Sequence, residues 1–290
     1  MYTSMEEWLC QTEQKNLPMW KVMQLNDCHE SNICETDSFE KMRTLYKAMI
    51  RSDADYDPAL HSASGLVGGE AELLRRYREK GQSMLDGFLS AVMERALRIA
   101  SSNACMHVIV ATPTAGSCGV LPSVLISAQQ YFSYPEDEII QSLYIAAGVG
   151  GIIAHRASIS GAAGGCQAEI GSASAMAASA LVSLRSGTCR QITDAAAIAL
   201  KGMLGLVCDP VCGLVEVPCV KRNVIGAVNA VSSAEMALAG IQSQIPADQV
   251  FDAMGQIGRQ MPASLRETAR GGLAATPEAE KIARRLKQKL

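Results

Sequence analysis

Three cysteines within fifteen residues are the strongest chemical signal in the sequence. Cys208, Cys212 and Cys219 lie in the stretch GLVCDPVCGLVEVPC, which contains two prolines and almost no charge. Thiolate ligands to zinc or iron need a backbone that bends around the metal, and glycine and proline turns allow this. Free cysteine is also among the residue types that are most often buried. Metal binding and simple packing are therefore both open for this stretch.

Two further cysteines occupy similar turn-rich positions. Cys166 directly follows Gly164 and Gly165, and Cys118 lies within TPTAGSCGVLP. The spacings match neither the C-x2-C pair of a zinc ribbon nor a ferredoxin run, so spacing alone is a weak indication of a metal. We interpret the remaining five cysteines as packed residues: Cys10, Cys28, Cys34, Cys105 and Cys189.

Composition narrows the setting in which these thiols act. The N-terminal stretch MYTSMEEWLCQTEQ carries acids where a signal peptide has lysines, and the apolar run 142–154 stops at His155. We therefore expect a cytoplasmic protein with no membrane partner, whose ten cysteines are reduced and form no disulfide framework. A net charge of −3 implies no strongly basic face, so nucleic acid is not an expected partner either.

The elements that position these cysteines are predicted to be helices. Aromatic residues make up only 4% of the chain, and its middle is rich in alanine, glycine and serine, which favours tight helical packing over a sandwich. We predict a single all-α domain over residues 1–290, with a helical N-terminal part (1–60), a core (61–275) and a C-terminal helix (276–290). Glycine-rich loops at 62–69, 112–119, 160–171 and 205–219 are expected to form a buried site.

Capping residues and prolines predict where the helices begin. A capping box from Ser4 to Glu7 starts the first helix, Pro18 the second, and Asp37 with Glu40 a third that runs to about Arg51. Later helices are predicted from 70 to 81, from Met84 to Ser101, from Pro135 to His155, up to Leu184, from a Thr193–Asp194 cap to Leu206, and at 224–241, 246–261 and 277–289.

Five motifs, in order along the chain, carry a resemblance to a known family. They are SGLVGGE (64–70), TPTAGSCGVLP (112–122), GGCQAEIGSASAMA (164–177), GLVCDPVCGLVEVPCVKRN (205–223) and RETARGGLA (266–274). Together they resemble the α chain of the iron–sulfur-dependent bacterial L-serine dehydratases. The resemblance extends over nearly the whole chain.

The resemblance implies a [4Fe–4S] cluster held by Cys166, Cys208 and Cys219. It departs from the family at Cys212, where relatives usually have glycine, so this thiol either packs or competes as a ligand. A second departure is that no cysteine follows Cys219, whereas single-chain relatives can end in a cysteine that reaches the cluster.

The implied reaction is the β-elimination of L-serine to pyruvate and ammonia, with an open iron as Lewis acid and without pyridoxal phosphate. His61, just before SGLVGG, is the predicted base, and Lys221 is a second candidate. His155 and Lys201 are further candidates for the same role. We expect the substrate carboxylate to be bound by residues of two glycine loops: Ser64, Gly65, Thr112, Thr114 and Gly116.

Two alternatives stay open at this point. An L-cysteine desulfidase of the same fold would keep the three ligands, and a non-catalytic iron–sulfur sensor would also need them. The family resemblance further implies a partner, because enzymes of this family occur as separate α and β chains or as one fused chain. We expect a β chain to contribute part of the site.

Overall fold

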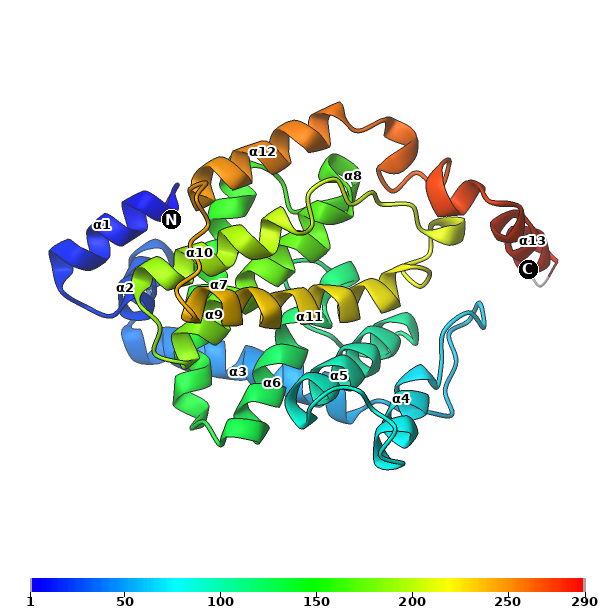
Figure 1. The fold of residues 1–290 in the computed structure, drawn as a ribbon, viewed down its shortest axis with the longest axis horizontal. Helices are drawn as coiled ribbons and strands as arrows, with labels where there is room; N and C mark the ends of the chain where they lie inside the picture. Colours follow the sequence, from blue (N-terminus) through cyan, green and yellow to red (C-terminus); the bar gives the residue numbers. More distant parts are fainter. Residues whose placement is uncertain (1, 289–290) are drawn as a thin grey trace.

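The computed structural model describes residues 2–288, which fold into helices and the turns that join them. Along these residues the structure contains no named strand, and only an isolated bridge joins Cys208 to Arg266. The all-α prediction is confirmed. The helices, shown in Figure 1, are α1 (Met5–Lys15), α2 (Met19–Ser31), α3 (Glu35–Ala54), α4 (Glu70–Glu79), α5 (Gly87–Ala104), α6 (Val120–Phe132), α7 (Glu136–Arg156), α8 (Gly161–Gly164), α9 (Ser172–Leu184), α10 (Cys189–Lys201), α11 (Cys219–Leu238), α12 (Ala247–Gln260) and α13 (Pro277–Lys287).

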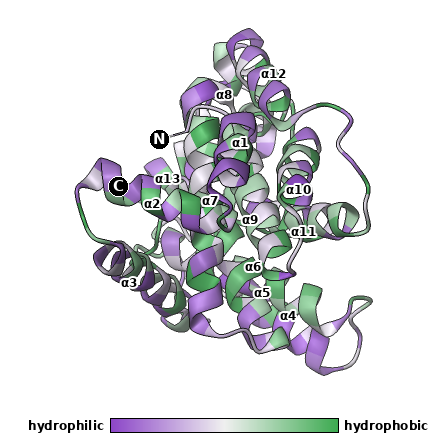
Figure 2. Cartoon of the chain, turned by 90° about the vertical axis from the view of Figure 1, so that its left-hand side faces the viewer, coloured by the Kyte–Doolittle hydropathy of each residue, from purple (hydrophilic) through white to green (hydrophobic). Residues whose placement is uncertain are grey.

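Helix α9 forms the centre of the core and packs against α6, α7, α10 and α11. Every residue of α9 except Ser183 is buried, and most of them are alanine or serine. Small side chains let neighbouring helices approach closely: a Cβ on Gly226 of α11 would lie 2.7 Å from the Ile170 side chain. Figure 2 shows hydrophilic and hydrophobic residues alternating along the outer helices α3 and α12, as expected of helices with one face on a core.

The capping signals located several helix starts correctly. Ser4 caps α1 by accepting a hydrogen bond from the Glu7 amide, and Pro18 and Pro135 immediately precede α2 and α7. The predicted cap at Thr193–Asp194 is wrong. Helix α10 instead begins after Thr188, whose side chain forms a capping box with Gln191, and it ends at Lys201 rather than Leu206.

Two further boundaries differ from prediction in a way that matters for the site. Helix α11 begins at Cys219, five residues earlier than expected, because Pro218 occupies its N-cap. The predicted loop 160–171 is partly helical, with the short α8 followed by a π-helical turn at Gln167–Gly171. Residues 289 and 290, at the end of the predicted C-terminal helix, lie outside the described residues.

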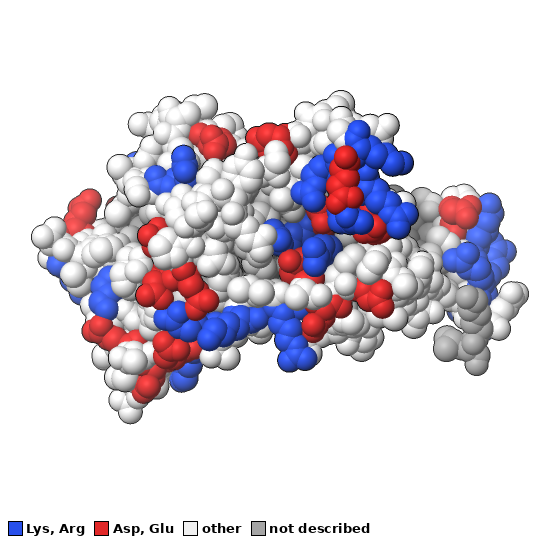
Figure 3. All heavy atoms as spheres, turned by 90° about the horizontal axis from the view of Figure 1, so that it is seen from below, with Lys and Arg blue, Asp and Glu red and all other residues white. Residues whose placement is uncertain are grey.

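Within the described residues, α7 is the one helix long and apolar enough to cross a membrane by length and composition. In this structure 67% of its apolar window is buried among other helices, as expected of a core helix. Figure 3 shows basic and acidic side chains intermingled on the lower face. On α4, Arg75 and Arg76 both pair with Glu72.

Candidate functional site: three cysteines from three loops

The three predicted ligands come from separate segments and lie near one another. Cys166 lies between α8 and the π-helical turn, Cys208 lies in an extended segment after α10, and Cys219 is the first residue of α11. Cys166 and Cys208 are buried, each 3% exposed, and Cys219 is half-buried. Gly165, at φ +76°, turns the chain into Cys166, and any side chain there would collide with Met261.

The electrostatics of the thiols show that they share one environment. Burial raises the pKa of Cys166 to about 11, and the Arg222 guanidinium opposes this rise. Burial, reinforced by Cys166, raises the pKa of Cys219 to about 12. The pKa of Cys208 is also well above its ordinary value, because of burial, the Glu169 carboxylate and both other thiols. The metal-free protein therefore holds three protonated thiols at neutral pH, and a metal that binds them must displace their protons.

Arg222 is the cation of this cluster of thiols. Its guanidinium donates to the Val207 carbonyl at 2.8 Å and to Asp209 Oδ1 at 2.9 Å, and its charge lowers the pKa of the nearby Cys166 thiol. Asp209 in turn accepts from the Leu273 amide at 2.8 Å through Oδ2. The Arg222–Asp209 ion pair thus joins the start of α11, which carries Cys219, to the Cys208 segment, and the Asp209–Leu273 hydrogen bond joins that segment to the C-terminal one.

The C-terminal segment is also attached directly to Cys208. The Cys208 amide donates to the Leu265 carbonyl at 2.8 Å, and the Cys208 carbonyl accepts from the Glu267 amide at 2.7 Å. Together with the Asp209–Leu273 contact, these bonds hold the RETARGGLA motif against the second predicted ligand.

Glu169 places a carboxylate beside the thiols, in space left by two glycines. Its Oε1 accepts from Thr114 Oγ1 at 2.7 Å, and its Oε2 lies 3.9 Å from Cys208 Sγ. A Cβ on Gly161 would lie 2.6 Å from Glu169 Oε2, and one on Gly116 would lie 3.2 Å from Oε1. Burial raises the pKa of Glu169, although the Thr114 hydrogen bond opposes this.

The loop that contains His61 is held against the Cys219 segment by Glu216. The buried Glu216 carboxylate accepts hydrogen bonds from Ser62 Oγ, at 2.9 Å, and from Ser64 Oγ. Ser64 Oγ also accepts from the Leu66 amide at 3.0 Å. The Ser64 hydroxyl, predicted to bind substrate, is thus already engaged within the loop, and the His61 side chain is exposed.

Replacement of Glu216 is expected to loosen this loop. In Glu216→Gln the two serine hydroxyls lose a charged acceptor, so the metal-free protein should lose about 1–3 kcal/mol of unfolding free energy. Urea denaturation of the metal-free protein measures this loss. Glu40→Gln, at an exposed surface pair with Arg43, is the matched control and should change stability by less than about 1 kcal/mol. Equal stability of Glu216→Gln and the parent would contradict the role given to Glu216.

The other residues predicted to bind substrate differ in their burial and in whether their polar groups already have hydrogen-bond partners. Thr112 is 4% exposed, and its buried Oγ1 has no hydrogen-bond partner. Thr114 contacts Glu169, as described above. Gly65 is exposed, in a left-handed conformation at φ +73°. The structure therefore places Thr114 and Gly116 beside Glu169, which lies next to Cys208, whereas Ser64 contacts Glu216.

Of the candidate bases, Lys221 lies closest to the cysteines along the chain, two residues after Cys219. It is exposed and pairs with Glu70 at 3.3 Å. His155 is exposed at the end of α7 and lies near Glu7, and Lys201 donates to the Ser243 carbonyl.

Cys212 and Cys118 differ from the three predicted ligands. Cys212 is exposed in a 3-10 turn, at φ +58°, and Cys118 is fully buried in the core.

Three cysteine thiols are donors of the kind that an iron–sulfur cluster would need. Among the described residues, no three His, Cys, Asp or Glu side chains are grouped to hold one metal ion. Two buried thiols and one half-buried thiol influence one another's pKa values, and each cysteine of an iron–sulfur cluster would bind a different iron. Beside Cys208, the Glu169 carboxylate fills the space left by Gly116 and Gly161.

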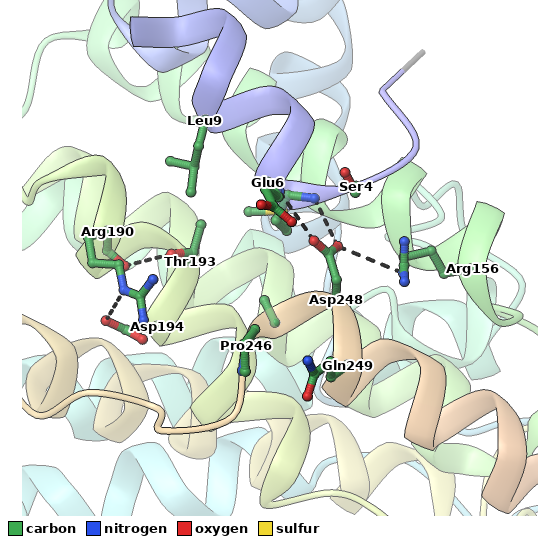
Figure 4. A pocket seen from close by; sticks show the side chains of 12 residues that line it. Ser4, Glu6, Leu9, Arg156, Arg190, Thr193, Asp194, Pro246, Asp248 and Gln249 are labelled. Carbon is green, nitrogen blue, oxygen red and sulfur yellow. Dashed lines mark hydrogen bonds and ion pairs between the residues drawn. The ribbon is translucent and has the colours of Figure 1, made fainter.

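One cavity is lined by residues of two of the predicted site loops, and a second cavity lies elsewhere in the structure. The first, of about 530 Å³, reaches Ser64 and Cys212 on one side and Ala283 and Leu286 of α13 on the other. The second, of about 510 Å³ and shown in Figure 4, lies between α1, α10 and the start of α12. There Asp248 accepts from the Met5 amide at 2.9 Å, and the lining includes none of the predicted site residues.

Three charged residues of the site are not predicted from the sequence: Glu169, Asp209 and Glu216. Each lies within three residues of a predicted ligand and is a charged residue in a stretch otherwise poor in charge. A charged residue so close to a predicted ligand, in a stretch poor in charge, could have been recognised from the sequence. The loop that each side chain contacts could not be predicted, because its partners come from distant segments of the chain.

Comparison with known proteins identifies similar chains. The family described as serine dehydratase alpha chain matches residues 14–274. A Bacillus subtilis protein named probable L-serine dehydratase, alpha chain, is 44% identical over 286 residues, covering 99% of this chain and 95% of the relative. A Latilactobacillus sakei protein of the same name is 55% identical over 192 residues, covering 66% and 91%. An L-serine dehydratase alpha chain of Peptoniphilus asaccharolyticus is 44% identical over 219 residues, covering 76% and 75%.

Relatives named without a chain designation are longer. The match covers 60% of one L-serine dehydratase and 40% of another. These longer relatives therefore contain additional sequence outside the region that matches this chain.

Proposed function

Because the chain belongs to the serine dehydratase alpha-chain family, we propose that it is the catalytic subunit of an L-serine dehydratase. The reaction breaks the α C–H and β C–O bonds of L-serine, releases water and leaves 2-aminoacrylate, which hydrolyses to pyruvate and ammonia. The observation that carries the proposal is the gathering of three thiols, two buried and one half-buried, from three segments of the chain beside the Glu169 carboxylate.

We propose Cys166, Cys208 and Cys219 as the ligands of a [4Fe–4S] cluster. When bound, such a cluster supplies Lewis acidity to the substrate oxygens. Arg222 would offset the negative charge of the thiolates, since its charge already lowers the pKa of the Cys166 thiol and its guanidinium is fixed by Asp209. Cys212, exposed on the outer side of the same loop, is proposed to be a non-ligand.

The chain's own residues would bind and orient serine. Thr112 offers a free buried hydroxyl, and the amides near Gly116 lie on the same loop. Glu169, beside Cys208, is the anionic group nearest the thiols that a substrate ammonium would meet. His61 remains the proposed base, on a loop that Glu216 holds against the Cys219 segment. Its exposed side chain is consistent with a site completed by a second chain.

Thr112→Val is expected to raise the KM for L-serine by about tenfold. The variant keeps the shape of the side chain but removes a buried hydroxyl, and loss of one hydrogen bond to a charged ligand costs about 1.5–3 kcal/mol. Steady-state kinetics of pyruvate formation measure it. Thr112→Ser retains the hydroxyl and should remain within about threefold of the parent. If both variants behave like the parent, Thr112 does not bind substrate.

Substrate comparison tests the function as a whole. Protein purified without oxygen is given L-serine, L-threonine or L-cysteine, with pyruvate, 2-oxobutyrate and sulfide as readouts. We expect serine to be preferred. A preference for cysteine with release of sulfide would indicate a desulfidase instead, and binding of iron without turnover of any amino acid would indicate a sensor.

We also propose a companion β chain in the cytoplasm. The names of the relatives designate an alpha chain, and the longer relatives contain additional sequence. All ten cysteines are free, which is consistent with a reducing compartment. The division of the chain into parts 1–60, 61–275 and 276–290 remains a prediction.

A further inference from the structure

Asn223 is a buried amide that joins two of the loops at the site. It lies one turn after Cys219 on α11 and is 1% exposed. Its Oδ1 accepts from the Gly119 amide at 2.8 Å, and its Nδ2 donates to the Gly116 carbonyl at 2.8 Å and to the Cys219 carbonyl at 3.0 Å. The side chain thus uses its acceptor and both donors at once.

The atoms around Gly119 leave little space for another conformation of the loop. A Cβ on Gly119 would lie 2.8 Å from the Ala96 carbonyl and 3.0 Å from Asn223 Oδ1. The end of the loop is therefore confined between α5 and α11. Within that confinement, the amide of Asn223 is the group that bonds to both the loop and the first turn of α11.

The same loop carries the groups that would orient substrate. Thr112 and Thr114 precede Gly116 by four and two residues, and Thr114 contacts Glu169. The Asn223 bond to the Cys219 carbonyl fixes this loop relative to the residue that bears the third thiol. We propose that Asn223 is a positioning residue, which sets the register between the Thr112–Gly116 loop and Cys219 so that serine is bound in one orientation.

This inference rests on the proposed function, and α11 offers a matched control. Asn229, on the same helix, also uses its Nδ2 for two bonds, to Ser174 Oγ at 2.7 Å and to the Ala199 carbonyl at 2.8 Å. It joins α11 to α9 and α10 rather than to a site loop. An effect due only to the loss of an amide from α11 should therefore be the same at both positions.

The experiment compares Asn223→Asp and Asn223→Ala with Asn229→Asp and Asn229→Ala. Aspartate keeps the acceptor for Gly119 but turns a carboxylate oxygen toward two carbonyl oxygens. We expect both Asn223 variants to keep the parent's iron content and to raise the serine KM by at least about tenfold relative to the Asn229 variants. Amide hydrogen exchange in peptides covering 112–119 of the metal-free protein should be at least about tenfold faster in Asn223→Ala than in Asn229→Ala.

The two readouts separate this inference from the proposed function. If the parent forms no pyruvate from serine, the proposed function fails, and hydrogen exchange still tests whether Asn223 orders the loop. If the parent is active and the Asn223 and Asn229 variants share the same KM and the same exchange rates, Asn223 is only a structural amide and the inference is wrong.

Discussion

Replacing any one of Cys166, Cys208 or Cys219 by serine is expected to abolish activity and to lower the iron content sharply. The three thiols come from three segments and influence one another's pKa values, so no other described cysteine is placed to substitute for a lost one. A hydroxyl is a poor ligand for iron compared with a thiolate. We expect pyruvate formation to fall by at least about 1,000-fold, with iron determined on the same anaerobic samples.

Cys212→Ser is the matched control for these variants. Cys212 lies four residues after Cys208, but its side chain is exposed on a 3-10 turn. Its replacement should leave both iron content and activity within about twofold of the parent. If Cys212→Ser lost iron while one of the other three variants kept it, the ligand set would have to be reassigned to include Cys212.

Gly161→Ala is expected to have the second largest effect. The added methyl group would lie 2.6 Å from Glu169 Oε2 and 3.1 Å from Cys208 Sγ, so the carboxylate, the thiol or α8 must move. Displacing groups of a catalytic site by about 1 Å can reduce the rate by about 100-fold. We expect kcat/KM for serine to fall by that order, measured alongside iron content.

The size of the steric conflict should decide the size of the effect. In Gly116→Ala the methyl group would lie 3.2 Å from Glu169 Oε1, so a small movement suffices, and we expect a loss of less than about tenfold. Gly150→Ala, which meets the flexible Met176 side chain inside the core, should alter stability more than kcat. Equal effects of Gly161→Ala and Gly116→Ala on kcat/KM would contradict the arrangement of Glu169 beside Cys208.

Local signals predicted the helices well where a cap or a proline stands alone. Ser4 and Pro135 are examples, because the groups that start each helix lie within one turn of it. The start of α10 was missed because the Thr188 capping box lies close to a second plausible cap at Thr193–Asp194. Asp194 is instead buried and accepts from the Ser243 amide, a contact across 49 residues that no local pattern predicts.

The features of the site also divide into those that could be predicted from the sequence and those that could not. The cysteines and glycine loops could be singled out from residue type and from the family resemblance. The partners of Glu169, Glu216 and Arg222 could not, since each contact joins segments that only the folded chain brings together. The engagement of Ser64 by Glu216 also shows why a hydroxyl in a glycine loop is not by itself evidence of a substrate ligand.

The most direct test is the content of iron, acid-labile sulfide and zinc in protein purified without oxygen, with pyruvate formation measured on the same preparation. We expect about four iron and four sulfide per chain, with serine turnover that is lost when the cluster is removed. Stoichiometric zinc, or an active protein without iron, would contradict this expectation and return the three cysteines to a structural role.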